Sequence, residues 1–329
     1  MNVLVTGGAG YIGSHAVKQL VGAGHRVVVV DNLFRGHRGA VIPEAAFHEL
    51  ALRDTEPLAR VLAEHEIDCV MHFAALAYVG ESVDKPLEYY ENNVSGAVSL
   101  LRAMRLAGVR RFVFSSTCAT YGQPERSPVV ETMRQEPLSP YGWSKWCVER
   151  ILKDTASADP QFAFVALRYF NVAGAAADGS LGEDHRPETH LIPLILQAAL
   201  GTRENITVFG TDYPTADGTC IRDYIHVEDL CAAHILAMEA LEPGDTRFYN
   251  LGIGRGYSVR EVLDSARRVT GREIAVEYGP RRPGDPAELY ADSTRIQRDL
   301  GWQPRYTEID SIVATAWNWL KHHPDGYAG

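Results

Sequence analysis

The sequence predicts an α/β fold in which a doubly wound parallel sheet is joined to a smaller lobe of mixed α/β structure. In the first half of the chain, short and nearly all-apolar runs alternate with segments of helical spacing. This alternation is typical of parallel strands that helices cover on both faces. The first apolar run also opens on a glycine-rich turn, Gly7 to Gly13. After about residue 170 the alternation becomes irregular, which predicts the second lobe.

The elements of the first half follow from hydrophobic spacing and from the residues that end each run. Strands are expected at residues 2–6, 26–31, 46–49, 68–72, 111–115 and 162–169. Helices are expected at residues 11–24, 55–65, 86–107 and 141–156. The third helix begins at Pro86, a residue type that is favoured in the first turn of a helix.

The second half contains shorter elements. Residues 171–193 are rich in Gly, Ala, Asp and Pro and are expected to be mostly loop. Helices are expected near residues 191–200, 227–241, 258–270 and 308–322. Trp317 and Trp319 are expected to pack the last of these helices onto the lobe.

Composition excludes several classes of protein. The net charge of −10 argues against nucleic acid or an anionic membrane as the main partner. The five cysteines are scattered without a C-x-x-C pair or zinc spacing, which is typical of reduced thiols in a cytoplasmic protein. No apolar run approaches the roughly 20 residues of a membrane span, and no secretory signal is recognisable.

The glycine-rich turn predicts a dinucleotide site. Gly7, Gly10 and Gly13 follow a strand and open a helix, where they permit a tight turn, close approach of a pyrophosphate and close helix packing. Asp31 ends the second strand 18 residues after Gly13, close to the position of the acid that binds ribose hydroxyls. A carboxylate there favours NAD over NADP. The alternative is that Asp31 only caps the turn before Asn32.

A second motif predicts proton transfer beside the cofactor. Tyr141 and Lys145 are four residues apart and therefore share one face of a helix. We expect the ammonium to lower the tyrosine pKa and make the phenol a usable acid or base. Thr117 ends the preceding strand at the carboxyl edge of the sheet, where ligands bind.

With these motifs in place, the chain resembles the extended short-chain dehydrogenase/reductases, and within them the sugar-nucleotide epimerases. The resemblance covers essentially the whole chain. It includes the runs Val79–Ser82, Tyr89–Asn93, Leu167–Asn171, Arg222–Val227 and Arg281–Asp285. It implies a Rossmann-type NAD-binding domain at residues 1–170, to which parts of 220–250 return, and a mainly UDP-sugar-binding lobe at residues 171–329.

The resemblance also implies an activity, reversible 4-epimerisation of a UDP-hexose (UDP-galactose to UDP-glucose) through a 4-keto intermediate. Tyr141 would be the acid and base, Lys145 would tune it, Thr117 would hold the 4-oxygen, and bound NAD would carry the hydride. The implied cofactor residues are Gly7, Gly10, Tyr11, Ile12, Gly13, Asp31, Asn32, Phe73, Ala74, Asn92, Lys145 and Tyr169. The implied substrate residues are Thr117, Tyr141, Asn171, His190, Leu191, Phe209, Arg222, Arg282 and Asp285.

Related functions stay open at this point. A UDP-xylose/UDP-arabinose 4-epimerase would keep the same motifs, and Leu289 aligns with the residue that gates N-acetylated sugars in relatives. A 4,6-dehydratase is disfavoured because Thr117 is followed by Cys118 and Ala119, not by acids. A non-catalytic NAD sensor is disfavoured because Tyr141 and Lys145 are both present.

Two further expectations concern the loop at residues 182–190 and the assembly. The loop contains two histidines and several acids, but their spacing fits no helical metal motif, so we expect a loop over the active site and no metal. The resemblance implies a homodimer that pairs through the helices at residues 86–107 and 141–156.

Overall fold

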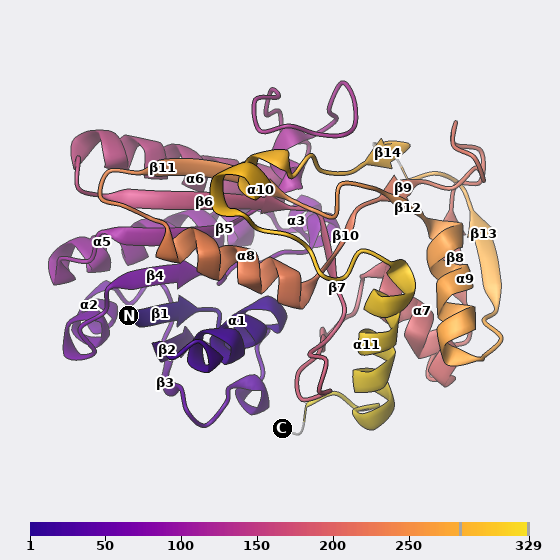
Figure 1. The fold of residues 1–329 in the computed structure, drawn as a ribbon, viewed down its shortest axis with the longest axis horizontal. Helices are drawn as coiled ribbons and strands as arrows, with labels where there is room; N and C mark the ends of the chain where they lie inside the picture. The colour runs from indigo at the N-terminus through magenta and orange to yellow at the C-terminus, as the bar shows by residue number, and fades with distance from the viewer. Residues whose placement is uncertain (283–284, 328–329) are drawn as a thin grey trace.

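A computed structural model describes residues 1–282 and 285–327 and confirms the predicted fold class (Figure 1). Seven strands form one sheet in the order β11-β6-β5-β4-β1-β2-β3, with neighbouring strands parallel. They are β1 (Asn2–Thr6), β2 (Arg26–Asp31), β3 (Ala46–Glu49), β4 (Cys69–His72), β5 (Arg111–Thr117), β6 (Ala163–Tyr169) and β11 (Thr246–Leu251). The first six coincide with the predicted strands to within one or two residues. β11 returns from much later in the chain to the edge beside β6.

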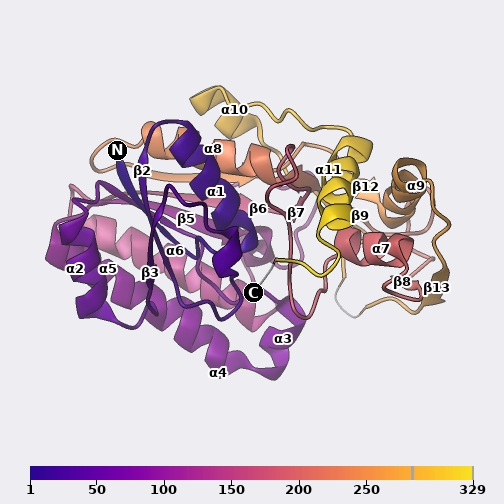
Figure 2. The same ribbon diagram turned by 90° about the horizontal axis from the view of Figure 1, so that it is seen from below.

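Helices cover both faces of this sheet (Figure 2). One face carries α1 (Tyr11–Gly22) and α8 (Val227–Glu239), and the other carries α2 (Thr55–Glu64), α5 (Gly96–Ala107) and α6 (Pro140–Ala158). Within β1, Val3 and Val5 join the first core whereas Leu4 joins the second. Because alternate residues of a strand face opposite sides, burial of both faces produces the continuous apolar runs seen in the sequence.

The helix predicted at residues 86–107 is present over its whole predicted range, but it contains a π-helical turn that the sequence did not indicate. It begins as predicted at Pro86 as α4 (Pro86–Tyr89), passes through a π-helical turn (Tyr90–Ser95) and continues as α5. The buried Asn93 lies in the π turn, where its amide bonds both the N–H and the C=O of Leu76 and also Ser144. The wider turn therefore holds the loop after β4 against α6, a linkage that periodicity does not reveal.

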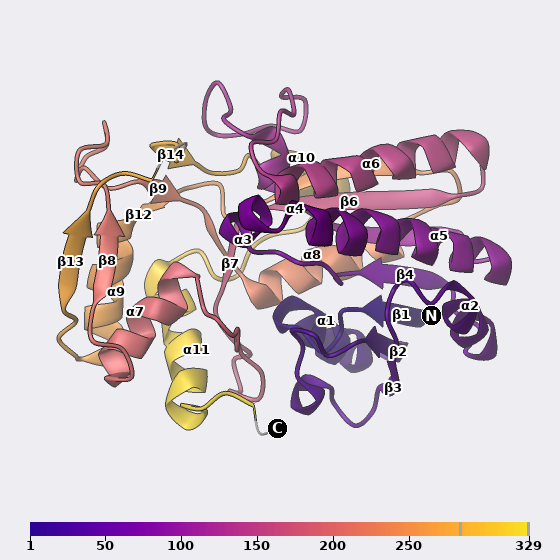
Figure 3. The same cartoon turned by 180° about the vertical axis from the view of Figure 1, so that it is seen from behind.

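The smaller lobe packs three helices around a core of its own (Figure 3). These are α7 (Leu191–Leu200), α9 (Val259–Thr270) and α11 (Ile309–His322), all close to their predicted bounds. Trp317 and Trp319 are buried, which confirms their packing role. Unpredicted elements are α3 (Val79–Asp84) and α10 (Thr294–Leu300), the pair β8 (Ile206–Phe209) and β13 (Val276–Gly279), and the short strands β7 (Asn171–Ala173), β9 (Ile221–Arg222), β10 (Tyr224–His226), β12 (Tyr257–Ser258) and β14 (Glu288–Leu289).

In the described ranges, none of the helices has both the length and the apolar character required to cross a membrane.

Candidate active site

A cavity of about 1060 Å³ lies along the carboxyl ends of the parallel strands and is closed on its far side by the smaller lobe. This is the edge of a doubly wound sheet at which ligands bind. Most of the predicted site residues line it: Gly7, Gly10, Tyr11, Ile12, Gly13, Asp31, Asn32, Phe73, Ala74, Asn92, Thr117, Tyr141, Lys145, Tyr169, Asn171, His190, Arg222 and Asp285. Three do not line it, namely Leu191, Phe209 and Arg282. The Arg282 guanidinium instead lies over the Phe209 ring, 4.3 Å from its centre. Pro283 and Gly284, part of the same predicted run, lie outside the described residues.

The glycine turn between β1 and α1 is built for close approach. Gly7 has φ +73°, and a Cβ there would lie 2.5 Å from the backbone N of Ala74. A Cβ on Gly13 would lie 2.0 Å from the carbonyl oxygen of Gly7. At Gly10, by contrast, a Cβ would meet only that same oxygen, at 3.3 Å, so this face of the turn is open.

The same turn has the electrostatics of an anion site. Gly10 is the N-cap of α1 and supplies no side-chain cap, and no acid lies in the first turn of the helix. The first residues of α1 line the cavity, so the positive end of the helix dipole lies at its wall. The residues present fit the pyrophosphate of a dinucleotide.

Asp31 ties the end of β2 to this turn. Its Oδ2 accepts a hydrogen bond from the N–H of Ala9 at 3.0 Å, and its Oδ1 accepts one from Leu33 at 2.8 Å. Burial raises the pKa of the carboxyl, against the opposing effect of these backbone donors. Asp31 therefore stabilises the turn before Asn32, as the alternative interpretation predicted. It also lines the cavity where a ribose would lie.

The tyrosine and the lysine lie at the start of α6. The helix begins there because Ser139 caps it, accepting from the N–H of Gly142 at 3.2 Å, and because Pro140 occupies its first position. The next residue, Tyr141, is 8% exposed, and Lys145 is 3% exposed. The Nζ of Lys145 donates to the carbonyl of Ser115 at 2.8 Å, which ties α6 to the end of β5.

Burial sets the acid–base properties of this pair. It raises the pKa of Tyr141 to about 12, with a smaller opposing effect of a hydrogen bond from Thr117. It lowers the pKa of Lys145 to about 7. In the protein without NAD, burial therefore outweighs the expected lowering of the tyrosine pKa by Lys145, whose Nζ donates to a backbone carbonyl.

At the lobe side of the cavity, two predicted substrate residues bond to each other. Arg222 forms an ion pair with Asp285, and its guanidinium also donates to the carbonyls of Ile221 at 2.6 Å and Pro286 at 2.8 Å. This ion pair is partly buried. Because Arg222 belongs to β9, the strand places the pair at the wall of the cavity. Leu289 of β14 lies beside it and lines the same wall.

A buried network behind β5 was not found from the sequence. Glu149 of α6 accepts from Ser116 at 2.6 Å and from the guanidinium of Arg168 on β6, at 2.8 Å and 2.6 Å. Arg168 also donates to the hydroxyl of Tyr121 at 2.8 Å. This network fixes the strand end that carries Thr117. Nothing in the spacing of Glu149 and Arg168 indicates their pairing, which depends on how α6 crosses the sheet.

The fold and the site together define an NAD-binding α/β enzyme of the short-chain dehydrogenase/reductase type. Residues 3–252 match the NAD dependent epimerase/dehydratase family, and the chain belongs to this family. It is 52% identical to the UDP-glucose 4-epimerase of Lacticaseibacillus casei, over 99% of both chains. It is 48% identical to a probable UDP-arabinose 4-epimerase 3 of Oryza sativa subsp. japonica, over 99% of this chain and 84% of the relative. A solved structure of the UDP-glucose 4-epimerase of Bifidobacterium longum in complex with NAD⁺ and UDP has a TM-score of 0.95, with 39% identity over 99% of this chain and 100% of that chain. These findings confirm the resemblance to the sugar-nucleotide epimerases.

Proposed function

We propose that the enzyme interconverts UDP-galactose and UDP-glucose by oxidation and reduction at C4 of the hexose. The observation that carries the proposal is that one cavity contains a dinucleotide turn, the buried trio Thr117, Tyr141 and Lys145, and a polar wall contributed by the smaller lobe. NAD, when bound, supplies the hydride acceptor and a positive charge beside the tyrosine. The identity to UDP-glucose 4-epimerases over the whole chain supports the choice of sugar.

In this proposal the chain's own residues hold the sugar and move one proton. As the phenolate, which the positive charge of bound NAD would favour, Tyr141 would accept the proton of the 4-hydroxyl on its Oη and later return that proton to the 4-oxygen of the sugar. The Oγ1 of Thr117 holds the 4-oxygen in place. Among the described residues the Nζ of Lys145 donates one hydrogen bond, to the carbonyl of Ser115, and its remaining N–H groups would hold the ribose next to the nicotinamide when NAD is bound.

The division of the chain follows from the same reasoning. We propose that residues 1–170, with parts of 220–250, hold NAD, and that residues 171–329 mainly hold the UDP group. Arg222 is suited to this second role because a planar guanidinium binds phosphate in a bidentate manner once it exchanges its partner, and the carboxylate of Asp285 is suited to accept hydrogen bonds from hydroxyl groups of the nucleotide. Strong contacts to UDP and few contacts to the hexose would let the 4-keto sugar rotate within the site and present its other face to the cofactor.

We also propose a homodimer that pairs through α3, α4, α5 and α6, which lie on one side of the molecule (Figure 3). Large apolar side chains are exposed along these helices, with Leu87 77%, Val83 64% and Val79 50% exposed. Trp143 of α6 is exposed as well. Burial of this surface against a second copy would remove it from water. A cytoplasmic location is supported by the five free cysteines.

A pentose is the second candidate substrate, and the 48% identity to a probable UDP-arabinose 4-epimerase favours it. The first experiment offers the purified protein UDP-galactose, UDP-xylose and UDP-N-acetylgalactosamine separately, without added cofactor, and follows the C4 epimer by NMR. Formation of UDP-glucose at the highest kcat/KM supports the proposal. A higher kcat/KM for UDP-xylose would make the pentose nucleotide the preferred substrate. Absence of any epimer, even with NAD supplied, would refute the proposed epimerase activity.

Tyr141→Phe is the matched control for that experiment. We expect it to retain NAD, measured by the nucleotide released on denaturation, while turnover falls by about 10²–10⁴-fold because the acid–base group is lost. Unchanged turnover would contradict the role given to Tyr141.

A further inference from the structure

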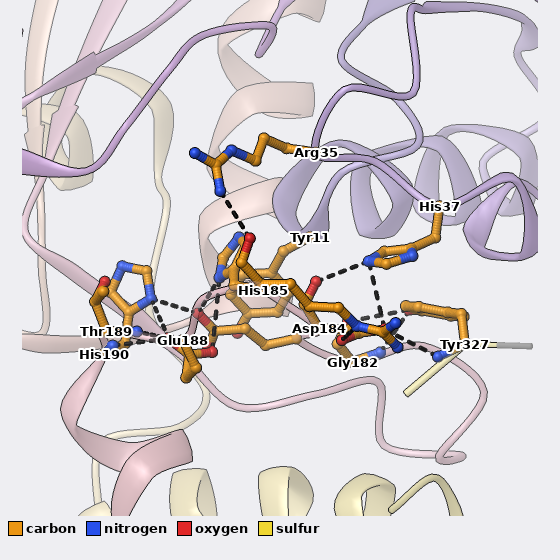
Figure 4. Close-up of polar contacts among 12 residues, drawn as sticks. Tyr11, Arg35, His37, Gly182, Asp184, His185, Glu188, Thr189, His190 and Tyr327 are labelled. Atoms are coloured by element: carbon orange, nitrogen blue, oxygen red, sulfur yellow. Dashed lines mark hydrogen bonds and ion pairs between the residues drawn. The ribbon is translucent and has the colours of Figure 1, made fainter. Parts of the chain in front are cut away.

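The loop between β7 and α7 brings four potential metal ligands to one point. One atom each of Glu183, His185, Glu188 and His190 lies within 4.8 Å of the corresponding atoms of the other three. The sequence spacing gave no indication of this, because no helix places the four residues on one face. Figure 4 shows the imidazoles of His185 and His190 turned toward the carboxylate of Glu188.

The distances match a tetrahedral site. The Nδ1 of His190 lies 2.8 Å from an oxygen of Glu183 and 3.0 Å from one of Glu188. The Nδ1 of His185 lies 2.9 Å from Glu183 and 3.7 Å from Glu188. Ligands about 2.0–2.1 Å from a tetrahedral Zn²⁺ lie about 3.3 Å from one another. The shortest of these distances, 2.8 Å, is about 0.5 Å below that spacing, so the side chains would have to move apart for the ion to enter.

Charge and burial favour a cation at this point. The side chains of Glu183 and Glu188 are only 7% and 6% exposed, although each carries a full negative charge when ionised. Two adjacent carboxylates removed from water need two positive charges close by. One divalent cation would carry a charge equal and opposite to that of the two carboxylates.

The backbone holds the ligands in position. One oxygen of Glu188 accepts from the N–H groups of Thr189 at 2.6 Å and His190 at 2.7 Å, which fixes the carboxylate within the loop. Hydrogen bonds of this kind orient ligands and are a regular feature of metal sites. The loop itself is tied to the first lobe, because Arg35 donates to the carbonyl of Arg186 at 2.7 Å and His37 bonds that of Asp184 at 2.9 Å (Figure 4).

We propose that Glu183, His185, Glu188 and His190 form a structural site for one divalent transition-metal ion, with Zn²⁺ as the ion that this donor set favours. Two imidazole nitrogens disfavour Mg²⁺ and Ca²⁺, which prefer all-oxygen ligands. Four protein ligands complete the tetrahedron and leave no open position for chemistry, so the ion has no part in the hydride step.

The position of the site gives it a role in the architecture. Glu183, His185 and His190 line the cavity beside Tyr11, which belongs to the glycine turn. His190 is also the N-cap residue of α7, the first helix of the smaller lobe. An ion here would fasten the loop across the cofactor end of the cavity and connect it to the lobe. This function is independent of which sugar the enzyme epimerises.

The test measures metal binding by the full-length protein. The chain is treated with a chelator, dialysed and titrated with Zn²⁺ against a colorimetric competitor, and with Co²⁺ followed by its visible absorption. We expect one equivalent of Zn²⁺ per chain and the intense absorption of tetrahedral Co²⁺. The variants Glu183→Gln and His185→Ala/His190→Ala should lose the stoichiometric ion and the cobalt spectrum.

The control is His48→Ala. His48 and His65 form a second histidine pair, with their Nε2 atoms 2.9 Å apart, but no carboxylate joins them in a four-ligand cluster within the described ranges. His48→Ala should bind one equivalent like the wild type. Absence of stoichiometric binding by the wild-type chain would overturn the proposal and leave the cluster as two ion pairs. Binding that survives in His185→Ala/His190→Ala, or that disappears in His48→Ala, would place the ion elsewhere and overturn it as well. Because the first readout uses the wild-type chain, a variant that fails to fold does not weaken the test.

Discussion

Removal of the guanidinium of Arg168 should destabilise the protein strongly. The side chains of Arg168 and Glu149 are 3% and 2% exposed, and two of the guanidinium nitrogens bond the carboxylate. Arg168→Met keeps the aliphatic volume but leaves the carboxylate of Glu149 buried, with Ser116 and Gln135 as its remaining side-chain donors among the residues that the structure describes. A buried ion pair that loses one partner costs about 3–5 kcal/mol, because the remaining charge is desolvated without compensation.

That free energy converts into a measurable shift. Unfolding entropy of roughly 2.1 cal/mol/K per residue gives about 0.7 kcal/mol/K for a chain of 329 residues. Arg168→Met should therefore lower Tm by about 4–7 °C, measured by differential scanning calorimetry at a fixed NAD concentration. Turnover should fall too, because the network holds the strand end that carries Thr117.

Two comparisons test the reasoning. The double variant Arg168→Met/Glu149→Leu should recover part of the loss, since it removes both charges together. Arg150→Met removes an exposed pair with Asp154 on the same helix and should leave Tm almost unchanged, because water screens an exposed ion pair. A Tm for Arg168→Met within 1 °C of the wild type, or a double variant less stable than the single one, would refute the assignment of the loss to an uncompensated charge.

The remaining predictions concern the glycine turn, the response to acid and the sugar pocket. Gly13→Ala should abolish NAD retention, because its Cβ would lie 2.0 Å from the Gly7 carbonyl oxygen, whereas Gly22→Ala on the same helix meets nothing within 4 Å and should be neutral or stabilising by up to about 1 kcal/mol. Burial lowers the pKa of His72 to about 3, so the unfolded chain binds its proton first as the pH falls below about 6.5. The free energy of unfolding should therefore fall progressively from pH 6.5 toward pH 4. His72→Asn should reduce that fall by on the order of 2–3 kcal/mol, which would appear as a smaller decrease of Tm with pH. Leu289→Ala should raise kcat/KM for UDP-N-acetylgalactosamine relative to UDP-galactose by about tenfold, because Leu289 lines the cavity wall.

Each of these has a result that contradicts it. Full NAD occupancy in Gly13→Ala would show that the backbone of the turn can move to accept the methyl group without loss of NAD binding. Equal acid sensitivity in His72→Asn and the wild type would show that the histidine does not drive the loss. An unchanged ratio of the two sugar nucleotides would remove Leu289 from the specificity wall.

Six of the seven strands of the central sheet, and the motifs that line the centre of the cavity, were predicted from the sequence. Continuous apolar runs identify strands buried on both faces, and the carboxyl ends of parallel strands share one edge. Motifs that follow those strands, such as the glycine turn or Thr117, must therefore meet. Tyr141 and Lys145 join them because residues four apart share a helix face.

Several features depend on contacts between distant segments of the chain, and these became known only from the folded structure. It placed a π turn within the helix predicted at residues 86–107, where Asn93 bonds Leu76 and Ser144. Phe209 and Arg282 contact each other and do not line the cavity. Burial raises the pKa of Tyr141 in the protein without NAD, whereas the sequence predicted that Lys145 would lower it. The folded structure also gathered the four ligands of the loop at residues 182–190, whose positions are set by contacts to the first lobe and not by any local period. Periodicity records which face of an element is buried, whereas the partner of a buried polar group depends on how the elements cross, and that is fixed only when the chain folds.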